Sequence, residues 1–521
     1  MLFEELWVSC AGPDKSVRDC FNWAPDVFAL SSRFLEESGS YRQAVSPPQG
    51  QQWLYEDWQK QAAWDGREWA EWINKPTRTL PRTLQWFHDT LLENMDKPVG
   101  VLSTDWEFVQ KMLRLHATCD EAGAGLGIPG GSDLAAYSHE ATRLLIEAGS
   151  LSHFPPQRVR VLPKRRTPQT GIDLRSLSHH LAAIHSETNV KYSLLPIPKI
   201  KRKRLELLLI PWPYDLSADA FSIHETNALP TMPTEYFGFF KYAPVEGPPI
   251  EKFVELVKEA RRISDGVDMV VLPESALTEP QLQQLERALD DDADLGDEEE
   301  PVIVAGVRSD TISGDFGRNR VVFSYLSTFG DRERFLQSKH HRWALDESQI
   351  LDYDLAEQLS PAKRWWEAIE IPERSLCLLA ITDWLMLCPL VCEDLARQEP
   401  LSRTLRAIGP TLVIALLLDG PQLVQRWPHR YASVLSDDPG SSVLTVTSLG
   451  MAMRSSPPRR ELRPVVASWK DAFHGYREIS LNPGNEALIL SLAPRQQRQW
   501  SADGRDSAAA IVTLLEEIYE L

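Results

Sequence analysis

The sequence lacks the features that mark several specialised classes of protein. Its six cysteines among 521 residues include no Cys-x-x-Cys pair, which argues against a disulfide framework and a zinc site. No apolar run approaches the ~20 residues that a membrane helix needs, and the longest, Leu412 to Leu418, fits a buried strand. The opening residues, MLFEELWVSC, place acidic residues early and no basic stretch before an apolar run, so we expect no signal peptide. These absences favour a cytoplasmic protein without a membrane contact.

The chain also has fewer basic than acidic residues, with 55 Lys and Arg against 74 Asp and Glu. The formal net charge is −19, which argues against a nucleic-acid-binding surface that covers the whole protein. Apolar residues make up 43% of the chain and charged residues 25%, as in ordinary globular proteins. The length predicts two or three domains.

The first segment, residues 1–150, is predicted to be a mostly helical domain rich in tryptophan. Nine of the 17 tryptophans lie between Trp7 and Trp106. Thr104 is predicted to cap one helix, and Ser132 to cap another that stops at Gly149. We interpret the tryptophans as a helical core, with a ligand groove as the alternative.

The second segment, residues 151–204, is predicted to be a basic connector. Between Arg158 and Arg204 it has 12 Lys and Arg residues against two acids, and several prolines suggest extended, irregular chain. The densest basic runs are 164–166 and 201–204. A solvated linker is the favoured interpretation, and a contact for nucleic acid or an acidic partner at 158–204 is the alternative.

The third segment, residues 205–521, alternates apolar strands with amphipathic helices. The run LELLLI at 205–210 is typical of a strand buried on both faces. Helices are expected at about 249–263 and 279–289. Further strands are expected at 269–272, 302–307, 320–326, 386–391, 412–418, 443–447 and 487–492. This alternation predicts an α/β fold in which helices cover sheets.

A carboxylate stands at the end of the predicted strand 269–272. Glu274 follows Pro273 directly after the apolar run, where partial burial raises the pKa of a carboxyl group and makes it a stronger base. Because glutamate in this position also often starts a helix, Glu274 alone defines no site.

A lysine follows the predicted strands of 320–336. Lys339, held in a partly dry site, could donate to a developing oxyanion, whereas a basic surface turn is the simpler interpretation. The adjacent His340 and His341 suggest a metal site only weakly, because neighbours in a chain seldom bind one ion and no carboxylate or cysteine is close in sequence. We therefore expect no metal and no cofactor.

A cysteine ends the predicted strand 386–391. Cys392 is followed by Glu393 and Asp394, where a helix could begin and lower the pKa of the thiol. The backbone N–H of Glu393 could then donate to an oxyanion. A buried structural cysteine is the alternative.

Taken in this order, the segments around Glu274, Lys339 and Cys392 resemble the carbon–nitrogen hydrolase (nitrilase) superfamily, which uses a Glu–Lys–Cys triad. The resemblance covers roughly residues 205–495, and the Cys-Glu-Asp form is most similar to glutaminase-type members. A second glutamate usually follows the lysine in this family; Glu347 is the best match, and its neighbour Asp346 is the fallback. The resemblance implies a four-layer αββα sandwich, which often forms a homodimer.

The chain also departs from the pattern of the family. Cys388 stands where a glycine is common, and Pro389 lies inside the strand before the nucleophile. The separation between Lys339 and Cys392 is longer than usual, and we attribute this to an insertion at about 355–375. These departures leave the preferred substrate open.

The resemblance implies a thiol-dependent hydrolase of a small amide or nitrile. Transfer of the acyl group to another acceptor would use the same triad. A different class of function is the alternative: a nitrilase-like sensing or interaction module of a bacterial antiviral defence assembly associated with a reverse transcriptase. In that case nucleic acid would bind the basic connector.

Overall fold

The computed structural model describes the chain apart from twelve short segments. The described residues are 1–46, 58–76, 79–131, 134–185, 188–195, 203–226, 232–264, 266–292, 300–309, 316–327, 330–372, 374–455 and 464–521. Among them, no helix combines the length and the apolar character that crossing a bilayer requires.

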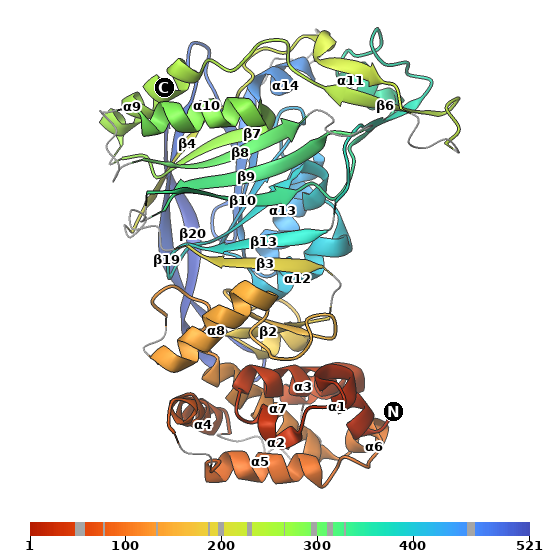
Figure 1. Cartoon of the computed structure of the whole chain (residues 1–521), viewed down its shortest axis with the longest axis vertical. Helices are drawn as coiled ribbons and strands as arrows, with labels where there is room; N and C mark the ends of the chain where they lie inside the picture. Colours follow the sequence, from red (N-terminus) through yellow and green to blue (C-terminus); the bar gives the residue numbers. More distant parts are fainter. Residues whose placement is uncertain are drawn as a thin grey trace.

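Two seven-stranded sheets form the centre of the molecule (Figure 1). The first sheet has the order β10-β9-β8-β7-β4-β19-β20, with strands β4 (Leu205–Leu209), β7 (Met269–Thr278), β8 (Val302–Ser309), β9 (Arg318–Leu326), β10 (Arg332–Ser338), β19 (Leu488–Trp500) and β20 (Asp506–Glu520). The second has the order β18-β17-β16-β15-β14-β13-β3, with strands β3 (Asn189–Leu194), β13 (Ser375–Ala380), β14 (Met386–Val391), β15 (Leu412–Leu416), β16 (Ser442–Val446), β17 (Val465–Asp471) and β18 (Gly475–Ser480).

Helices cover the outer face of each sheet. Helices α9 (Ile250–Ile263) and α10 (Glu279–Asp290) pack together, and α10 contacts β7 and β8. Helices α13 (Trp427–Asp437) and α14 (Leu449–Arg454) contact the second sheet, and the two sheets contact each other through pairs such as β7 with β15. These layers form the four-layer αββα sandwich that was expected.

The sequence of β4 shows why both faces of this strand are buried. Leu207 and Leu209 belong to the core between the sheets, whereas Leu208 belongs to the core beneath α9 and α10. Successive side chains of a strand point to opposite faces, so a continuous apolar run fits a sheet that is covered on both sides.

The N-terminal region is helical, as predicted. Its helices are α1 (Phe3–Ala11), α2 (Val17–Cys20), α3 (Ala24–Ser38), α4 (Trp58–Ile73), α5 (Arg82–Leu92), α6 (Val99–Leu102), α7 (Trp106–Ala122) and α8 (Ala135–Ala148). Trp7, Trp23, Trp58, Trp69 and Trp72 are buried and support the aromatic-core interpretation, while Trp64 and Trp86 are exposed. The apolar core runs without a break from these helices into the second sheet.

The caps of two helices can be compared with the sequence predictions. Helix α7 is capped by Asp105, whose Oδ1 accepts the N–H of Phe108 at 3.2 Å, so the predicted cap at Thr104 is wrong by one residue. Helix α8 stops at Gly149, which has a φ of 60°. The predicted cap Ser132 lies outside the described residues.

The segment 151–204, predicted to be an irregular connector, contains regular structure in part. It holds β1 (Arg160–Pro163), β2 (Leu181–Ile184) and β3, and β3 is an edge strand of the second sheet, parallel to β13. The basic run Lys164, Arg165 and Arg166 is buried. Residues 196–202, which include the first two of the four residues of the second basic run, lie outside the described residues.

Backbone carbonyl groups explain why charged side chains can be buried in this segment. Lys164 donates to the carbonyl of Ser178 at 2.6 Å, and Arg165 donates to that of Asp383 at 2.9 Å. Since buried charges are tolerated when hydrogen bonds replace water, these residues join elements rather than face a partner. These three side chains cannot serve as the nucleic-acid contact proposed for 158–204.

The β19–β20 hairpin reaches from the first sheet to the helical region (Figure 1). Near its turn, Arg505 is 5% exposed and forms ion pairs with Asp120 at 3.0 Å and Asp503 at 3.0 Å. Asp120 also accepts the backbone N–H groups of His179, His180 and Leu181. Burial alone would raise the pKa of Asp120, but Arg505, followed by His180 and His179, outweighs it and lowers that pKa.

Replacing Arg505 by methionine is expected to destabilise the protein by about 3–5 kcal/mol, because it leaves buried carboxylates without their cation. Urea unfolding of the full chain measures this loss. Arg498→Met is the control on the same hairpin, because Arg498 pairs with Asp506 in an exposed position. Equal stability of the two variants would contradict a structural role for the Arg505 cluster.

Candidate active site

Glu274 lies in an irregular part of β7. The pairing of β7 with β8 shifts in register between Leu272 and Leu277, and Ser275 has a φ of 55°. A Cβ on Gly306 of β8 would lie 2.4 Å from Cα of Glu274, so only glycine fits there. This irregularity places the Glu274 side chain in the interior, where it is 1% exposed.

Lys339 follows β10 and is fully buried. Its Nζ donates to Oε1 of Glu274 at 2.7 Å and to Oε2 of Glu367 at 2.5 Å. A lysine ammonium has three N–H donors, so these two bonds leave one donor without a partner among the described residues. Burial alone would lower the pKa of Lys339, but the two carboxylates outweigh it and raise that pKa well above its usual range.

The second carboxylate beside Lys339 is Glu367. The structure therefore corrects the prediction that Glu347 takes this position. Glu347 is the first residue of α11 (Glu347–Asp352), where it is exposed, and the fallback Asp346 caps that helix. Glu367 ends β12 (Arg364–Glu367), a strand of the small sheet that also contains β5 (Phe221–His224), β6 (Phe237–Tyr242) and β11 (Ala344–Leu345).

Asn319 connects the two carboxylates. Its Nδ2 donates to Oε1 of Glu274 at 2.7 Å and to Oε1 of Glu367 at 2.7 Å. The backbone N–H of Trp343 donates to Glu367 as well, at 3.2 Å. The segment that the sequence marked only as an insertion therefore supplies a buried partner of Lys339.

Cys392 lies where β14 ends and a short 3-10 helix (Cys392–Leu395) begins. Its φ is 43°, it is 2% exposed, and it lines a cavity of about 250 Å³ together with Trp343, Asp419 and Trp427. Burial and then the Glu274 carboxylate raise the pKa of the Cys392 thiol, whereas Lys339 opposes this shift. A thiol in this site stays protonated at neutral pH until a base removes its proton.

Glu274 has the properties of such a base. Burial is the main cause that raises the pKa of Glu274, and Lys339 and Asn319 oppose it. Its Oε1 carries both hydrogen bonds, and its Oε2 is buried without a hydrogen-bond partner among the described residues. One carboxylate oxygen is therefore held in place while the other remains able to accept a proton.

Asp394 joins the segment after Lys339 to the segment after Cys392. Its carboxylate accepts the backbone N–H of His340 at 3.0 Å and lies 2.9 Å from Nδ1 of His341. The paired histidines are thus part of the framework of the site. No group of three metal-binding side chains occurs in the described part of the chain.

The backbone and the side chain of Glu393 have different environments. It is the second residue of the 3-10 helix, and N–H groups in a first turn lack partners within their helix. Its side chain forms an ion pair with Arg397, and both residues line the cavity of Cys392. Glu393 therefore follows Cys392 directly in the chain and lines the same cavity.

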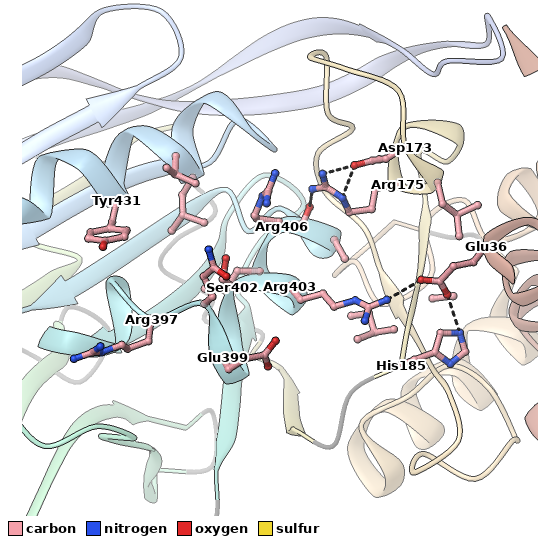
Figure 2. A pocket seen from close by; sticks show the side chains of 18 of the residues that line it. Glu36, Asp173, Arg175, His185, Arg397, Glu399, Ser402, Arg403, Arg406 and Tyr431 are labelled. Carbon is pink, nitrogen blue, oxygen red and sulfur yellow. Dashed lines mark hydrogen bonds and ion pairs between the residues drawn. The ribbon is translucent and has the colours of Figure 1, made fainter. Parts of the chain in front are cut away.

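A second and larger cavity, of about 480 Å³, adjoins this site (Figure 2). Residues from the helical region, from the 151–204 segment and from the sandwich line it. Glu36 of α3 binds Arg403 at 2.8 Å and faces His185, as Figure 2 shows. The two cavities share Ala396, Arg397 and Tyr431.

The fold and the site together define an αββα sandwich with a buried glutamate, lysine and cysteine. No family model matches the chain, and no curated protein matches it. Solved structures do match. Nit3 of Saccharomyces cerevisiae, a member of branch 10 of the nitrilase superfamily, is 12% identical with a TM-score of 0.32, and the match covers 55% of this chain and 89% of Nit3.

Two further solved structures match the chain at similarly low sequence identity. XC1258 of Xanthomonas campestris, a CN-hydrolase superfamily protein with an arsenic adduct in its active site, is 11% identical with a TM-score of 0.26, over 61% of this chain and 89% of XC1258. The C. elegans NitFhit protein is 13% identical with a TM-score of 0.29, over 52% of this chain and 57% of NitFhit. Nit3 and XC1258 are members of the superfamily that the sequence motifs resemble, and identities this low assign no activity.

Proposed function

We propose that the chain is a thiol-dependent hydrolase that cleaves a non-peptide carbon–nitrogen bond, an amide or a nitrile. One observation supports this above all. The buried carboxylate of Glu274 forms an ion pair with the buried ammonium of Lys339, and both interact electrostatically with the buried thiol of Cys392, which lines a cavity. Burying these charges is costly, so their retention in one place favours a chemical role.

In the proposed mechanism Glu274 takes the proton of the Cys392 thiol, and the thiolate attacks the carbon of the amide. The remaining donor of Lys339 and the N–H of Glu393 stabilise the negative oxygen of the intermediate. Glu274 then gives its proton to the nitrogen, which leaves as ammonia or an amine, and a thioester remains. Water, deprotonated by Glu274, attacks the thioester, and the acid and the free thiol form as the proton returns to sulfur.

Mass spectrometry of the intact chain tests this proposal. We expect iodoacetamide to label Cys392 first, and this labelling to slow about 100-fold or more in Glu274→Gln, because a positioned base contributes ~10²–10⁴ to a rate. A panel of small amides and nitriles should also yield an adduct on the wild-type chain that is missing from Cys392→Ala.

The test also measures labelling of Cys392 in Lys339→Ala and labelling of the other buried cysteines in the wild-type chain. Cys10 and Cys119 are buried away from the site and serve as internal references. A Cys392 that reacts no faster than they do, with no dependence on Glu274 or Lys339, would mean that the site is not an activated nucleophile. Attention would then return to a sensing or interaction role for the helical region.

A further inference from the structure

The carboxylate of Asp394 links the two chain segments that carry Lys339 and Cys392. Asp394 lies in the short 3-10 helix that starts at Cys392, and its side chain is fully buried. Its Oδ1 and Oδ2 accept the backbone N–H of His340 at 3.1 Å and 3.0 Å, and Oδ1 lies 2.9 Å from Nδ1 of His341. The two residues that follow Lys339 are therefore held by the residue two places after Cys392.

The two linked segments belong to different sheets. Lys339 follows β10 of the first sheet, and Cys392 follows β14 of the second. Gln337 also joins β10 to the second sheet, because its side chain donates to the carbonyl of Ser375 at 2.8 Å. Ser375 starts β13, however, whereas Asp394 lies in the loop of the nucleophile itself. The contacts of Asp394 thus fix the turn of Lys339 directly to the loop of Cys392.

Asp394 lies outside the wall of the Cys392 cavity. The described residues that line this cavity include its neighbour Glu393 but not Asp394, which lines the larger cavity instead. A carboxylate can only accept hydrogen bonds, so Nδ1 of His341 carries a proton where this bond forms. The donors that follow Lys339 replace water around the buried carboxylate. Asp394 can therefore act on the reaction only through the groups that it holds in place.

The position of Lys339 affects Cys392 in two ways. Burial and then the Glu274 carboxylate raise the pKa of the Cys392 thiol, and the Lys339 ammonium opposes this rise. In the proposed mechanism the remaining donor of Lys339 also stabilises the negative oxygen of the intermediate, and such a donor acts only within hydrogen-bond distance. A small shift of the turn after β10 would therefore change both the ionisation of the thiol and the stability of the intermediate.

We propose that Asp394 is a positioning residue, which holds the Lys339 ammonium beside the Cys392 thiol by binding the backbone of His340 and the imidazole of His341. This role rests on the proposed hydrolase function, because it requires that Lys339 acts on the nucleophile. A substitution at Asp394 should then slow the reaction of Cys392 by displacing Lys339. The same substitution should have no further effect once the Lys339 ammonium is absent.

A double-mutant cycle on the labelling of Cys392 by iodoacetamide tests this coupling. The four chains are the wild type, Asp394→Asn, Lys339→Ala and the double variant, and peptide mass spectrometry gives the rate at Cys392. We expect Asp394→Asn to slow labelling about tenfold, because a misplacement of ~1 Å can cost up to ~100-fold in rate. Residues that act through one another are not additive, so the double variant should react as fast as Lys339→Ala alone.

Asp471→Asn is the matched control for a loss of stability. The Asp471 side chain is fully buried, its Oδ1 accepts the backbone N–H groups of Phe473 and His474 at 2.7 Å, and its Oδ2 lies 3.3 Å from Nδ1 of His474. Lys470 pairs with Val443 near the start of β16, which runs parallel to β14 through β15, whereas the nucleophile follows the other end of these strands. We expect this variant to keep wild-type labelling even where urea unfolding shows that it is less stable.

Two variants of His341 test the same contact from the other side. His341→Phe removes the N–H donor from a side chain that is 20% exposed, so this chain should still fold, and we expect slower labelling of Cys392. His341→Asn brings an amide N–H close to the position of Nδ1 and should recover most of the rate. Equal rates in the two variants would contradict a role for the bond between His341 and Asp394.

The outcomes separate this role from the hydrolase function. Normal labelling in Asp394→Asn, with labelling that still depends on Lys339, would overturn the positioning role and leave the hydrolase proposal intact. A slowing that multiplies with that of Lys339→Ala would also overturn it, since Asp394 would then act independently of Lys339. Labelling that depends on neither Lys339 nor Glu274 would overturn both proposals. With turnover established, Asp394→Asn should lower kcat and leave KM nearly unchanged, as expected when an interaction made in the transition state is lost.

Discussion

Replacing Glu367 by glutamine is expected to slow both labelling of Cys392 and amide hydrolysis about 100-fold, the loss that follows when a catalytic group moves by ~1 Å. Glu367 binds Lys339 at 2.5 Å and Asn319 at 2.7 Å, and both of these residues bind Glu274. Without its charge the Lys339 ammonium would shift toward Glu274 and hold the proposed base more tightly. Rates with iodoacetamide and with a small amide check the expectation.

Glu347→Gln is the matched control for this variant. Sequence reasoning placed Glu347 in the site, whereas the structure places it on the surface at the start of α11. We expect this variant to keep wild-type rates. Loss of activity in Glu347→Gln with normal activity in Glu367→Gln would restore the sequence-based assignment and contradict the geometry described above.

The pH profile of Glu367→Gln separates positioning from folding. A displaced Lys339 would lower the pKa of Glu274, so the rise of the labelling rate with pH should move toward lower pH.

Several strands, and the positions of Lys339 and Cys392 directly after strands, could be predicted because the relevant signal is local. The apolar runs of β4, β7 and β14 are long enough to identify buried strands, and Cys392 directly follows β14. Glu274, predicted to follow a strand that ends at residue 272, lies instead inside β7, which continues to Thr278. In an α/β fold, side chains at strand ends meet at one edge of a sheet. Here, however, Lys339 follows β10 of the first sheet and Cys392 follows β14 of the second, so their meeting depends on how the two sheets pack, which a strand-end position alone does not predict.

Glu367 could not be found in this way because nothing in its local sequence marks it. It ends a short strand of four residues in a segment that interrupts the expected order of elements. Its place in the site follows from pairing of β12 with β6, which is a contact between segments far apart in the sequence. A carboxylate that reaches its partner through such a pairing carries no spacing signal.

The buried basic run of the predicted connector was missed for a related reason. Charged and proline-rich sequence is usually solvated, and the prediction followed that tendency. Here backbone carbonyl groups from other segments, such as those of Ser178 and Asp383, replace water around Lys164 and Arg165. Hydrogen-bond partners supplied by distant backbone groups leave no trace in side-chain composition, so the burial of these charges becomes visible only in three dimensions.

Lys339→Met is expected to destabilise the protein by about 3–5 kcal/mol at pH 7, in addition to removing activity. The side chain is fully buried between Glu274 and Glu367, and methionine fills a similar volume without a charge. Two buried carboxylates would then face each other without a cation. Removing one partner of a buried ion pair destabilises a protein because it leaves a buried charge without compensation. Urea unfolding with a probe that reports on the sandwich measures the loss.

The pH dependence of that loss identifies its cause. With no cation, burial and mutual repulsion would raise the pKa of one carboxyl above its unfolded value of about 4.3. A carboxyl group whose folded pKa is raised favours folding at low pH, so the deficit of the variant should shrink as the pH falls from 7 toward 5. The double variant Lys339→Met with Glu274→Gln removes one negative charge and should recover part of the stability at pH 7. A deficit that stays constant with pH, and that the second substitution leaves unchanged, would mean that lost packing outweighs electrostatics around Lys339.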